Sequence, residues 1–325
     1  FNISTLSPLT GYVTSSNCGG NFGYYLKKAG LDGLILCGHS ETPVWLELRD
    51  GQAVFHPADG LWGQKTEQTQ AMLDDALRLP NGRVRKNGKI CIGPAGEHQV
   101  LYSCVVSNER VAGRGGAGAV MGWMKLKAVC AGGTQTVQVK EPERMIAHNQ
   151  KWFRYLRKHP LTGSQLPRLG TAGLVSSMQM KGILSTKNYS AGQYADFEQI
   201  SGERLAEQYH IVNKGCLSCP IRCARTVEID GKQVKGPELE TLVLLGSGIC
   251  NSNLEVILRW NYELDQLGMD TISCANTIAY AMEANEKGLW NNGLQFSDIE
   301  ELSQLFEQIA HLQGIGDELA EGSKR

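Results

Sequence analysis

The sequence has no long apolar run, no block of like charge and almost no net charge. Its apolar stretches fall well short of the roughly 20 residues that a membrane-spanning helix needs, and no basic-then-apolar leader opens the chain. The formal net charge is −1 over 325 residues, which provides no basic field for nucleic acid or for anionic lipid. We therefore expect neither nucleic-acid nor membrane partners, and a cytoplasmic location.

The composition is that of an ordinary globular protein with length enough for two domains. Ten cysteines are spread thinly over the chain, which favours reduced thiols plus a metal site over a disulfide framework. Cys37, Cys91, Cys104 and Cys130 lie in apolar runs, and we expect them in the core.

Three cysteines gather in the segment GCLSCPIRC, residues 215–223. A short loop can turn the thiols of Cys216, Cys219 and Cys223 toward one iron–sulfur cluster, and thiolates are the ligands that such clusters take. A zinc knuckle or three buried cysteines are the alternatives. The third cysteine and the rigid Pro220 favour the cluster, which still needs a fourth ligand.

A glycine pair stands before a predicted helix near the start of the chain. Gly19 and Gly20 follow Asn17 and precede an amphipathic pattern that begins at Phe22. Glycines at a helix N-terminus expose backbone N–H groups and let an anion approach closely. A phosphate seat and an ordinary loop with Asn21 as the helix N-cap are equally compatible with this stretch.

A second glycine cluster occupies residues 110–122. It lacks the strand–GxGxxG–helix setting of a dinucleotide loop. Arg110 and Arg114 instead place two guanidiniums among the backbone amides of Gly115 and Gly116, which is chemistry suited to phosphate. A close-packed structural glycine turn is the alternative.

A helix predicted at 254–267 ends at Gly268 and places Asp265 in its last turn, where a carboxylate opposes the helix dipole. Together with Asp270, this carboxylate could accept hydrogen bonds from a polar heterocycle. Alternatively, Asp270 is only the N-cap of the next helix, predicted at 271–287.

The patterning predicts an α+β fold with a β-rich N-terminal cofactor-binding domain, residues 1–138, followed by a mainly helical domain, residues 139–325. Pro237 is expected in the first turn of a helix. The carboxylates of Glu238 and Glu240 would lie near the N-terminus of this helix, where the helix dipole stabilises negative charge. Predicted strands are 2–6, 34–37, 44–48, 53–56, 89–92, 101–106 and 126–131, and further predicted helices are 66–79, 141–158, 170–181 and 202–210. Asp50 and Gly51 predict a hairpin turn between the strands at 44–48 and 53–56.

Several stretches in order resemble the tungsten- and molybdenum-containing aldehyde ferredoxin oxidoreductase family. Each motif is weak alone, but their succession is specific and the resemblance covers essentially the whole chain. The matching stretches are SPLTG and SSNCGGNFG (7–23), IGPAGE (92–97), GRGGAGAVMG (113–122), CLSCPIRC (216–223), GPELET (236–241), DQLGMDT (265–271) and AMEANEKG (281–288).

The resemblance implies a set of site residues. A magnesium ion (Mg) bridging two pterin phosphates would be held by Asn17 and the backbone of Val111. The phosphates would lie against Gly19, Gly20, Arg110, Arg114, Gly115 and Gly116. One pyranopterin would be gripped by the segment that contains Asp265, Gly268, Met269, Asp270 and Thr271. Three ligands of one 4Fe-4S cluster would be Cys216, Cys219 and Cys223, and Glu240 would be the proton-moving glutamate near the metal.

The implied function is oxidation of aldehydes to carboxylic acids by a bis-pyranopterin tungsten or molybdenum centre, with electrons leaving through the 4Fe-4S cluster to ferredoxin or another electron-transfer subunit. Alternatives are a family member acting on an aromatic thioester or a sugar aldehyde, or a non-catalytic iron–sulfur electron-transfer protein. The resemblance also implies that the start of the first domain and the whole third domain of the family lie outside these 325 residues.

Overall fold

The computed structural model describes residues 1–209 and 212–324. Its fold is α+β, with most strands in the N-terminal part and most helices in the C-terminal part, as predicted. Contacts group the chain into two compact units, each drawn from separate stretches of sequence. The first contains Phe1–Gln138, Glu263–Ser273 and Ser303–Arg325, and the second contains Val139–Tyr262 and Cys274–Leu302.

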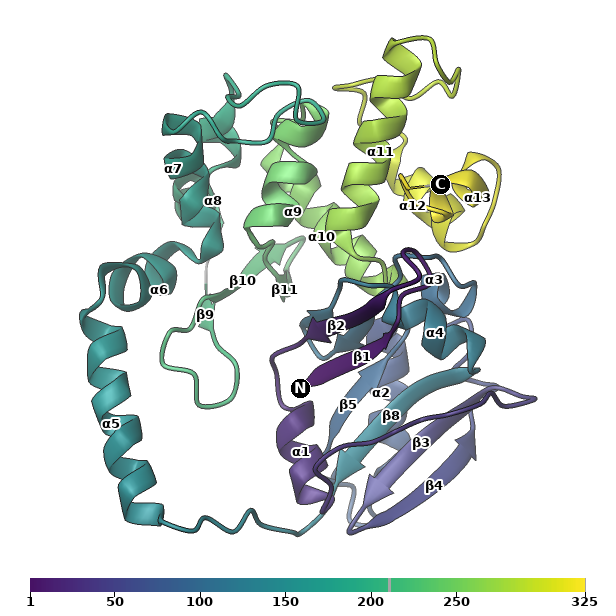
Figure 1. Cartoon of the computed structure of the whole chain (residues 1–325), viewed down its shortest axis with the longest axis vertical. Coiled ribbons are helices and arrows are strands. Elements are labelled where there is room, and N and C mark those ends of the chain that lie inside the picture. Colours follow the sequence, from purple (N-terminus) through teal and green to yellow (C-terminus); the bar gives the residue numbers. More distant parts are fainter. Residues whose placement is uncertain (210–211, 325) are drawn as a thin grey trace. The chain divides into compact units, whose positions relative to one another are not determined.

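The first unit is organised around a mixed six-stranded sheet of order β4-β3-β8-β5-β6-β7. β8 pairs parallel with β3 and antiparallel with β5, and Figure 1 shows these strands side by side. The predicted turn at Asp50 and Gly51 is confirmed, because both residues adopt the positive φ that a tight hairpin requires. The strands are β3 (Val44–Arg49), β4 (Gln52–Pro57), β5 (Gly88–Cys91), β6 (Val105–Ser107), β7 (Arg110–Ala112) and β8 (Leu126–Gly132).

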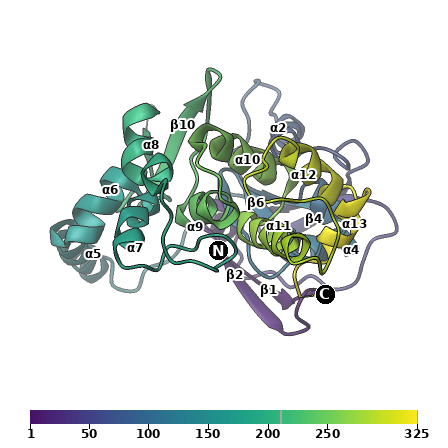
Figure 2. The ribbon, with the colours of Figure 1, turned by 90° about the horizontal axis from the view of Figure 1, so that it is seen from above.

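Helices cover both faces of this sheet. Alternate residues of β3 point to opposite faces, so that Leu46 packs with Phe22 in one core cluster and Trp45 packs with Leu73 in the other. α12 and α13 lie together at the C-terminal end (Figure 2). The remaining elements are the hairpin β1 (Asn2–Leu6) and β2 (Val13–Asn17), and α1 (Phe22–Lys28), α2 (Thr66–Ala76), α3 (Pro94–Glu97), α4 (Ala117–Trp123), α12 (Leu302–Ala310) and α13 (Ile315–Ala320).

The second unit is mainly helical and contains one small antiparallel sheet of order β11-β10-β9. α10 and α11 contribute residues to both units. The strands are β9 (Val212–Lys214), β10 (Ala224–Ile229) and β11 (Lys232–Lys235). The helices are α5 (Pro142–Lys158), η1 (Leu161–Gln165), α6 (Leu166–Leu169), η2 (Thr171–Leu174), α7 (Val175–Met180), η3 (Phe197–Ile200), α8 (Gly202–Gln208), α9 (Leu239–Leu244), η4 (Ser247–Ile249), α10 (Leu254–Leu267) and α11 (Thr271–Glu286).

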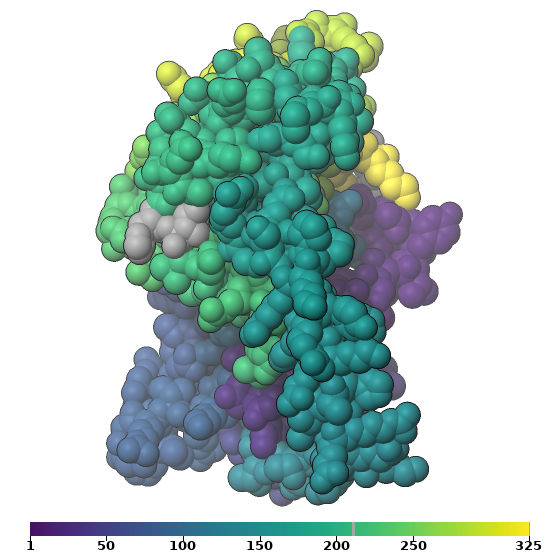
Figure 3. All heavy atoms as spheres, turned by 90° about the vertical axis from the view of Figure 1, so that its left-hand side faces the viewer, coloured from purple at the N-terminus to yellow at the C-terminus, as the bar shows by residue number. Residues whose placement is uncertain are grey.

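α5 is a helix without a buried residue. Trp152 and Tyr155 are exposed. Figure 3 shows the face of the molecule on which the teal atoms of this part of the chain lie at the surface. Among the described residues, none of the helices combines the length and apolar character needed to cross a membrane.

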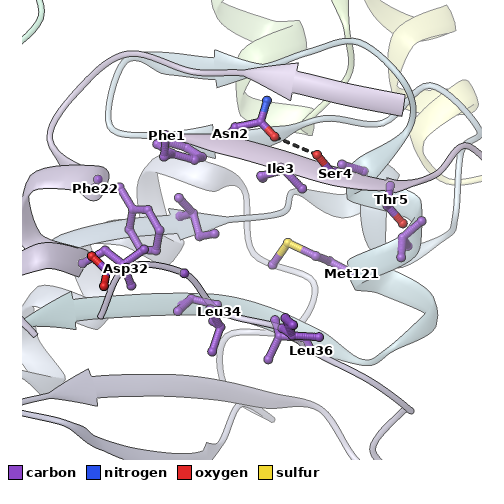
Figure 4. Close-up of a pocket in the computed structure, with 18 of the residues that line it drawn as sticks. Phe1, Asn2, Ile3, Ser4, Thr5, Phe22, Asp32, Leu34, Leu36 and Met121 are labelled. Atoms are coloured by element: carbon purple, nitrogen blue, oxygen red, sulfur yellow. Dashed lines mark hydrogen bonds between the residues drawn. The ribbon is translucent and has the colours of Figure 1, made fainter. Parts of the chain in front are cut away.

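The strand predicted at Leu34–Cys37 is wrong. This segment forms no ladder, and Cys37 is exposed rather than in the core. Leu36 packs against the core, and Leu34 and Leu36 line a cavity of about 620 Å³ between the segment, the β1 strand and the sheet (Figure 4), whereas Ile35 is 90% exposed. A short apolar run does not distinguish such packing from a strand.

Two further predictions need correction. The strand predicted at 101–106 begins only at Val105, because Leu101 donates its N–H to Ala320 and Cys104 donates to Gly268 instead of to a neighbouring strand. Pro237 lies before the helix, whose first residue is Leu239. The end predicted for the 202–210 helix lies outside the described residues.

Candidate functional site

The first glycine loop and the β6–β7 hairpin meet in the first unit. A Cβ placed on Gly20, which has φ +83°, would lie 3.6 Å from Cγ of Arg110. Asn108, in the turn of that hairpin, donates from its side-chain amide to Oδ1 of Asn21 at 3.0 Å. Two sequence clusters separated by about ninety positions thus form one surface, with Gly19 exposed and Arg110 half-buried.

Asn17 and Val111 occupy strand positions beside this surface. Asn17 ends β2, is exposed, and accepts a hydrogen bond on Oδ1 from the side chain of Asn2 at 2.9 Å. Val111 lies on β7 opposite Val106. Asn21 stands at the N-cap of α1, but its side chain makes no capping hydrogen bond.

The second glycine cluster is joined to the segment at 268–273. Nη1 of Arg114 donates to Oδ2 of Asp270 at 3.0 Å and to Oγ of Ser273 at 2.9 Å. The backbone at Gly113 also lies against this carboxylate, since a Cβ there would be 2.9 Å from Oδ1 of Asp270. Both guanidiniums of the cluster therefore lie near predicted cofactor-binding residues, Arg110 beside Gly20 and Arg114 beside Asp270.

Asp270 is the N-cap of α11, which is one of the two interpretations that its position in the sequence allowed. Its Oδ2 accepts from the N–H of Ser273 at 3.1 Å, and only 5% of the residue is exposed. The carboxylate thus both completes the helix N-terminus and fixes Arg114. Thr271 is the first residue of this helix.

The glycines of the second cluster are sites of close packing. Gly115 and Gly116 have φ of +95° and +74°. A Cβ at Gly115 would lie 2.7 Å from Cγ2 of Thr14, and a Cβ at Gly116 would lie 2.9 Å from Cγ of Pro8. The structural explanation for these glycines therefore holds whether or not they also face phosphate.

A glycine–glycine contact holds the bend after α10. Gly268 has φ +76°, and a Cβ there would be 2.7 Å from the backbone nitrogen of Gly93. Met269 is fully buried and forms an isolated antiparallel β-bridge with Ser103. The carbonyl of Asp265 accepts a hydrogen bond from Thr66 at the start of α2. The bend is thus attached to the sheet domain through the IGPAGE motif.

The same motif contains a buried ion pair that the sequence did not reveal. Glu97 pairs with Lys127 of β8, which is 0% exposed. The other carboxylate oxygen of Glu97 accepts the N–H of Gly63 at 2.7 Å, and Lys127 also donates to the carbonyl of Gln64 at 2.8 Å. A single lysine in an otherwise apolar strand was the signal that could have identified it.

The three cysteines of the motif occupy one loop between β9 and β10 of the second unit. The N–H of Cys219 donates to the carbonyl of Cys216 at 3.0 Å, and Ser218 and Arg222 adopt positive φ, which folds the loop back on itself. All three cysteines are partly exposed. By contrast, burial raises the pKa of Cys91 and of Cys130 to about 12, as expected of core thiols.

No group of three His, Cys, Asp or Glu side chains is gathered tightly enough to hold a metal ion within residues 1–209 and 212–324. The three thiols therefore share a loop without converging in the structure. The loop supplies three thiol donors on an accessible turn, which fits a cluster chemically.

Glu240 lies in the first turn of α9 and is exposed. Its neighbour Glu238 is the N-cap residue and accepts a hydrogen bond from the hydroxyl of Thr171 at 2.6 Å. Burial lowers the pKa of Arg225, a residue of β10, while the charges of Cys223 and Glu238 oppose that shift. The sequence analysis did not identify Arg225 as a site residue. The signal that could have identified it is its position, two residues after Cys223.

Family models match both halves of the chain. Residues 1–133 match the N-terminal domain of aldehyde ferredoxin oxidoreductase, and residues 147–325 match its domains 2 and 3. The chain belongs to the aldehyde ferredoxin oxidoreductase family of enzymes.

Individual relatives agree with this assignment. The chain is 36% identical over its whole length to a tungsten-containing aldehyde ferredoxin oxidoreductase of Pyrococcus furiosus and 35% identical to one of Thermococcus kodakarensis, in each case covering 54% of the relative. The structure matches the active-site complex of a benzoyl coenzyme A reductase bound to a dienoyl-CoA, with a TM-score of 0.84, 26% identity, 99% of this chain and 51% of the other. The chain thus spans about half the length of these relatives.

Proposed function

We propose that this chain is part of a tungsten- or molybdenum-pterin oxidoreductase that oxidises aldehydes to carboxylic acids. The observation that carries the proposal is the convergence of separate motifs in the first unit, where Gly20 contacts Arg110 and Arg114 binds Asp270. These contacts place two guanidiniums beside exposed or half-buried backbone, an arrangement suited to the phosphates of a pterin cofactor.

The residues of the first unit would bind and orient the cofactor. Arg110 and the loop at Gly19 and Gly20 would neutralise phosphate, while Asn17 and the Val111 carbonyl would supply oxygen ligands to magnesium, which prefers oxygen. Asp265 would accept hydrogen bonds from the pterin ring, and Asp270 would act mainly through Arg114, because its Oδ2 is already engaged by Arg114 and Ser273.

The residues of the second unit would hold the cluster and move a proton. Cys216, Cys219 and Cys223 would supply three thiolates to a 4Fe-4S cluster, with a fourth ligand from elsewhere. When bound, the pterin-held metal supplies two-electron redox chemistry that no side chain provides. Glu240, at an exposed helix N-terminus, would accept and release the substrate-derived proton through its carboxylate.

Electrons would leave singly through the cluster to ferredoxin or to another electron-transfer subunit, in the cytoplasm. The names of the relatives support a ferredoxin acceptor for them, and this chain resembles them along its full length.

The first test is elemental analysis for W, Mo, Fe and Zn on the full-length protein purified without oxygen, with a visible spectrum of the same sample. About four irons and one tungsten or molybdenum per chain are expected. Iron without the heavier metal would indicate an electron-transfer protein, and zinc alone would overturn the proposal.

Variants separate the two sites. Cys219→Ser should lose iron, whereas the matched control Cys37→Ser, an exposed cysteine of the first unit, should retain it. Glu240→Gln should retain both metals and lose turnover of aldehydes, and activity equal to the parent would remove the assigned role of Glu240.

A second candidate substrate class is an aromatic thioester, favoured by the match in structure to a benzoyl coenzyme A reductase complex. Assaying the same preparation with aldehydes and a viologen acceptor, and with benzoyl-CoA or a dienoyl-CoA, distinguishes the two. Turnover of only the thioester would assign the chain to that chemistry.

A further inference from the structure

A buried arginine lies directly behind the cysteine loop. Arg225 is the second residue of β10, two positions after Cys223, and only 4% of it is exposed. Charged side chains are almost never buried to this extent unless they are paired.

The guanidinium of Arg225 is held by backbone carbonyls. Nη1 donates to the carbonyls of Arg222 at 3.0 Å and of Ala224 at 2.9 Å, and Nη2 donates to the carbonyl of Leu166. The first of these carbonyls belongs to the peptide bond that carries Cys223. The charge is therefore fixed against the loop that displays the thiols.

Two glycines enclose the arginine. A Cβ at Gly170 would lie 3.4 Å from Cζ of Arg225 and 2.9 Å from the carbonyl oxygen of Cys223, and a Cβ at Gly236 would lie 3.1 Å from Cβ of Arg225. Positions 170 and 236 thus leave room for the side chain and for the backbone of the cysteine loop at the same time.

The arginine makes no direct ion pair with another described residue. Its Nε is buried with no hydrogen-bond acceptor. The charges of Glu238 and Cys223 act on it, but within the described part of the chain no carboxylate forms a salt bridge with its guanidinium. Carbonyl dipoles and a carboxylate that is not in direct contact offset only part of the desolvation of a buried cation. An anion at the cysteine loop would remove this deficit.

An iron–sulfur cluster held by thiolates is such an anion, and its reduction adds one further negative charge. Charge and hydrogen bonding around a cluster set its reduction potential. We infer that Arg225 is a positioning residue that stabilises the reduced cluster at Cys216, Cys219 and Cys223 and raises its reduction potential. This inference rests on the cluster assigned under the proposed function.

The test is a redox titration of the cluster, followed by electron paramagnetic resonance, in full-length protein purified without oxygen. Arg225→Met removes the charge and keeps much of the volume, and Arg225→Lys keeps the charge. Arg222→Gln is the matched control, because Arg222 lies in the same loop but is exposed to water, which screens its charge.

We expect Arg225→Met to lower the equilibrium constant for one-electron reduction at least tenfold, which corresponds to about 59 mV. For Arg225→Lys and Arg222→Gln, the equilibrium constant for one-electron reduction should stay within about threefold of the parent value. A threefold change corresponds to about 0.7 kcal/mol. If Arg225→Met binds no iron and Arg225→Lys binds it normally, the charge is required for assembly and the inference also holds.

Other outcomes overturn the inference. An unchanged potential in Arg225→Met, an equal shift in Arg222→Gln, or loss of iron from both Arg225 variants would assign Arg225 to packing alone. Parent protein without iron would refute the cluster itself, and with it the proposed function, which is a different result from a cluster that is insensitive to Arg225.

Discussion

The ion pair between Glu97 and Lys127 offers a direct test of how the sheet supports the candidate cofactor site. Glu97 ends the IGPAGE motif, whose Gly93 packs against the bend at Gly268. Lys127 is 0% exposed, and its ammonium group is shared between Glu97 and the carbonyl of Gln64. Replacing Lys127 by Met leaves a carboxylate that is buried and lacks its countercharge.

Breaking a buried pair by removing one partner costs about 3–5 kcal/mol. At about 1.4 kcal/mol per tenfold change, the amides of β8 and α3 should lose roughly two to three and a half powers of ten in hydrogen-exchange protection. Local exchange is the appropriate measurement because a chain with two compact units need not unfold in one step.

The double variant Lys127→Met with Glu97→Gln provides the control. The side-chain amide introduced at position 97 can still accept the N–H of Gly63, and no charge remains buried, so the double variant should be less destabilised than Lys127→Met alone. A double variant with the summed loss of both single variants would refute the reasoning, because packing and not charge pairing would then account for the effect.

Three further predictions follow from individual contacts. Gly268→Ala should destabilise the bend by more than about 1 kcal/mol, measured by exchange in peptides covering 264–273, because its φ is +76° and the new Cβ would approach the nitrogen of Gly93 at 2.7 Å; unchanged protection would contradict this. Thr134 donates its N–H and its hydroxyl to Asp50 and thereby lowers the carboxyl pKa below its ordinary 3.8, so this stabilisation is present above that pH and is lost as pH falls through the lowered value. A carboxyl NMR titration of Asp50 with a midpoint at or above 3.8 would disprove the assignment. Asp270→Ala should remove the cap of α11 at a cost of about 1 kcal/mol, whereas Asp270→Asn keeps the cap and loses only the ion pair with its arginine partner, a difference that hydrogen exchange in the first turn of α11 will show.

Local patterns predicted the elements whose causes are local. The helix at 254–267 was predicted from its apolar spacing and from Gly268. The apolar side chains that set this spacing are all buried, namely Leu254, Ile257, Leu258, Leu264 and Leu267. The hairpin turn at Asp50 and Gly51 followed from turn chemistry alone. The motif order also indicated the family, which the family models confirm.

Long-range contacts decided the rest. Leu34–Cys37 has the composition of a strand but lies along a cavity without a ladder. Leu36 packs against the core there without strand pairing, and Ile35 stays exposed. No local signal shows that residues 263–273 and 303–325 group with the first 138 residues.

The sequence by itself determined the chemistry that is available, namely three closely spaced thiols, two guanidiniums within a glycine cluster and carboxylates at helix ends. Only the tertiary structure decided which of these groups meet. It joined Gly20 to Arg110 and Arg114 to Asp270, paired Lys127 with Glu97, and buried Arg225 behind the cysteine loop. The physical reason is that burial and charge pairing depend on neighbours far away in the sequence, whereas turns, caps and periodicity depend on neighbours close by.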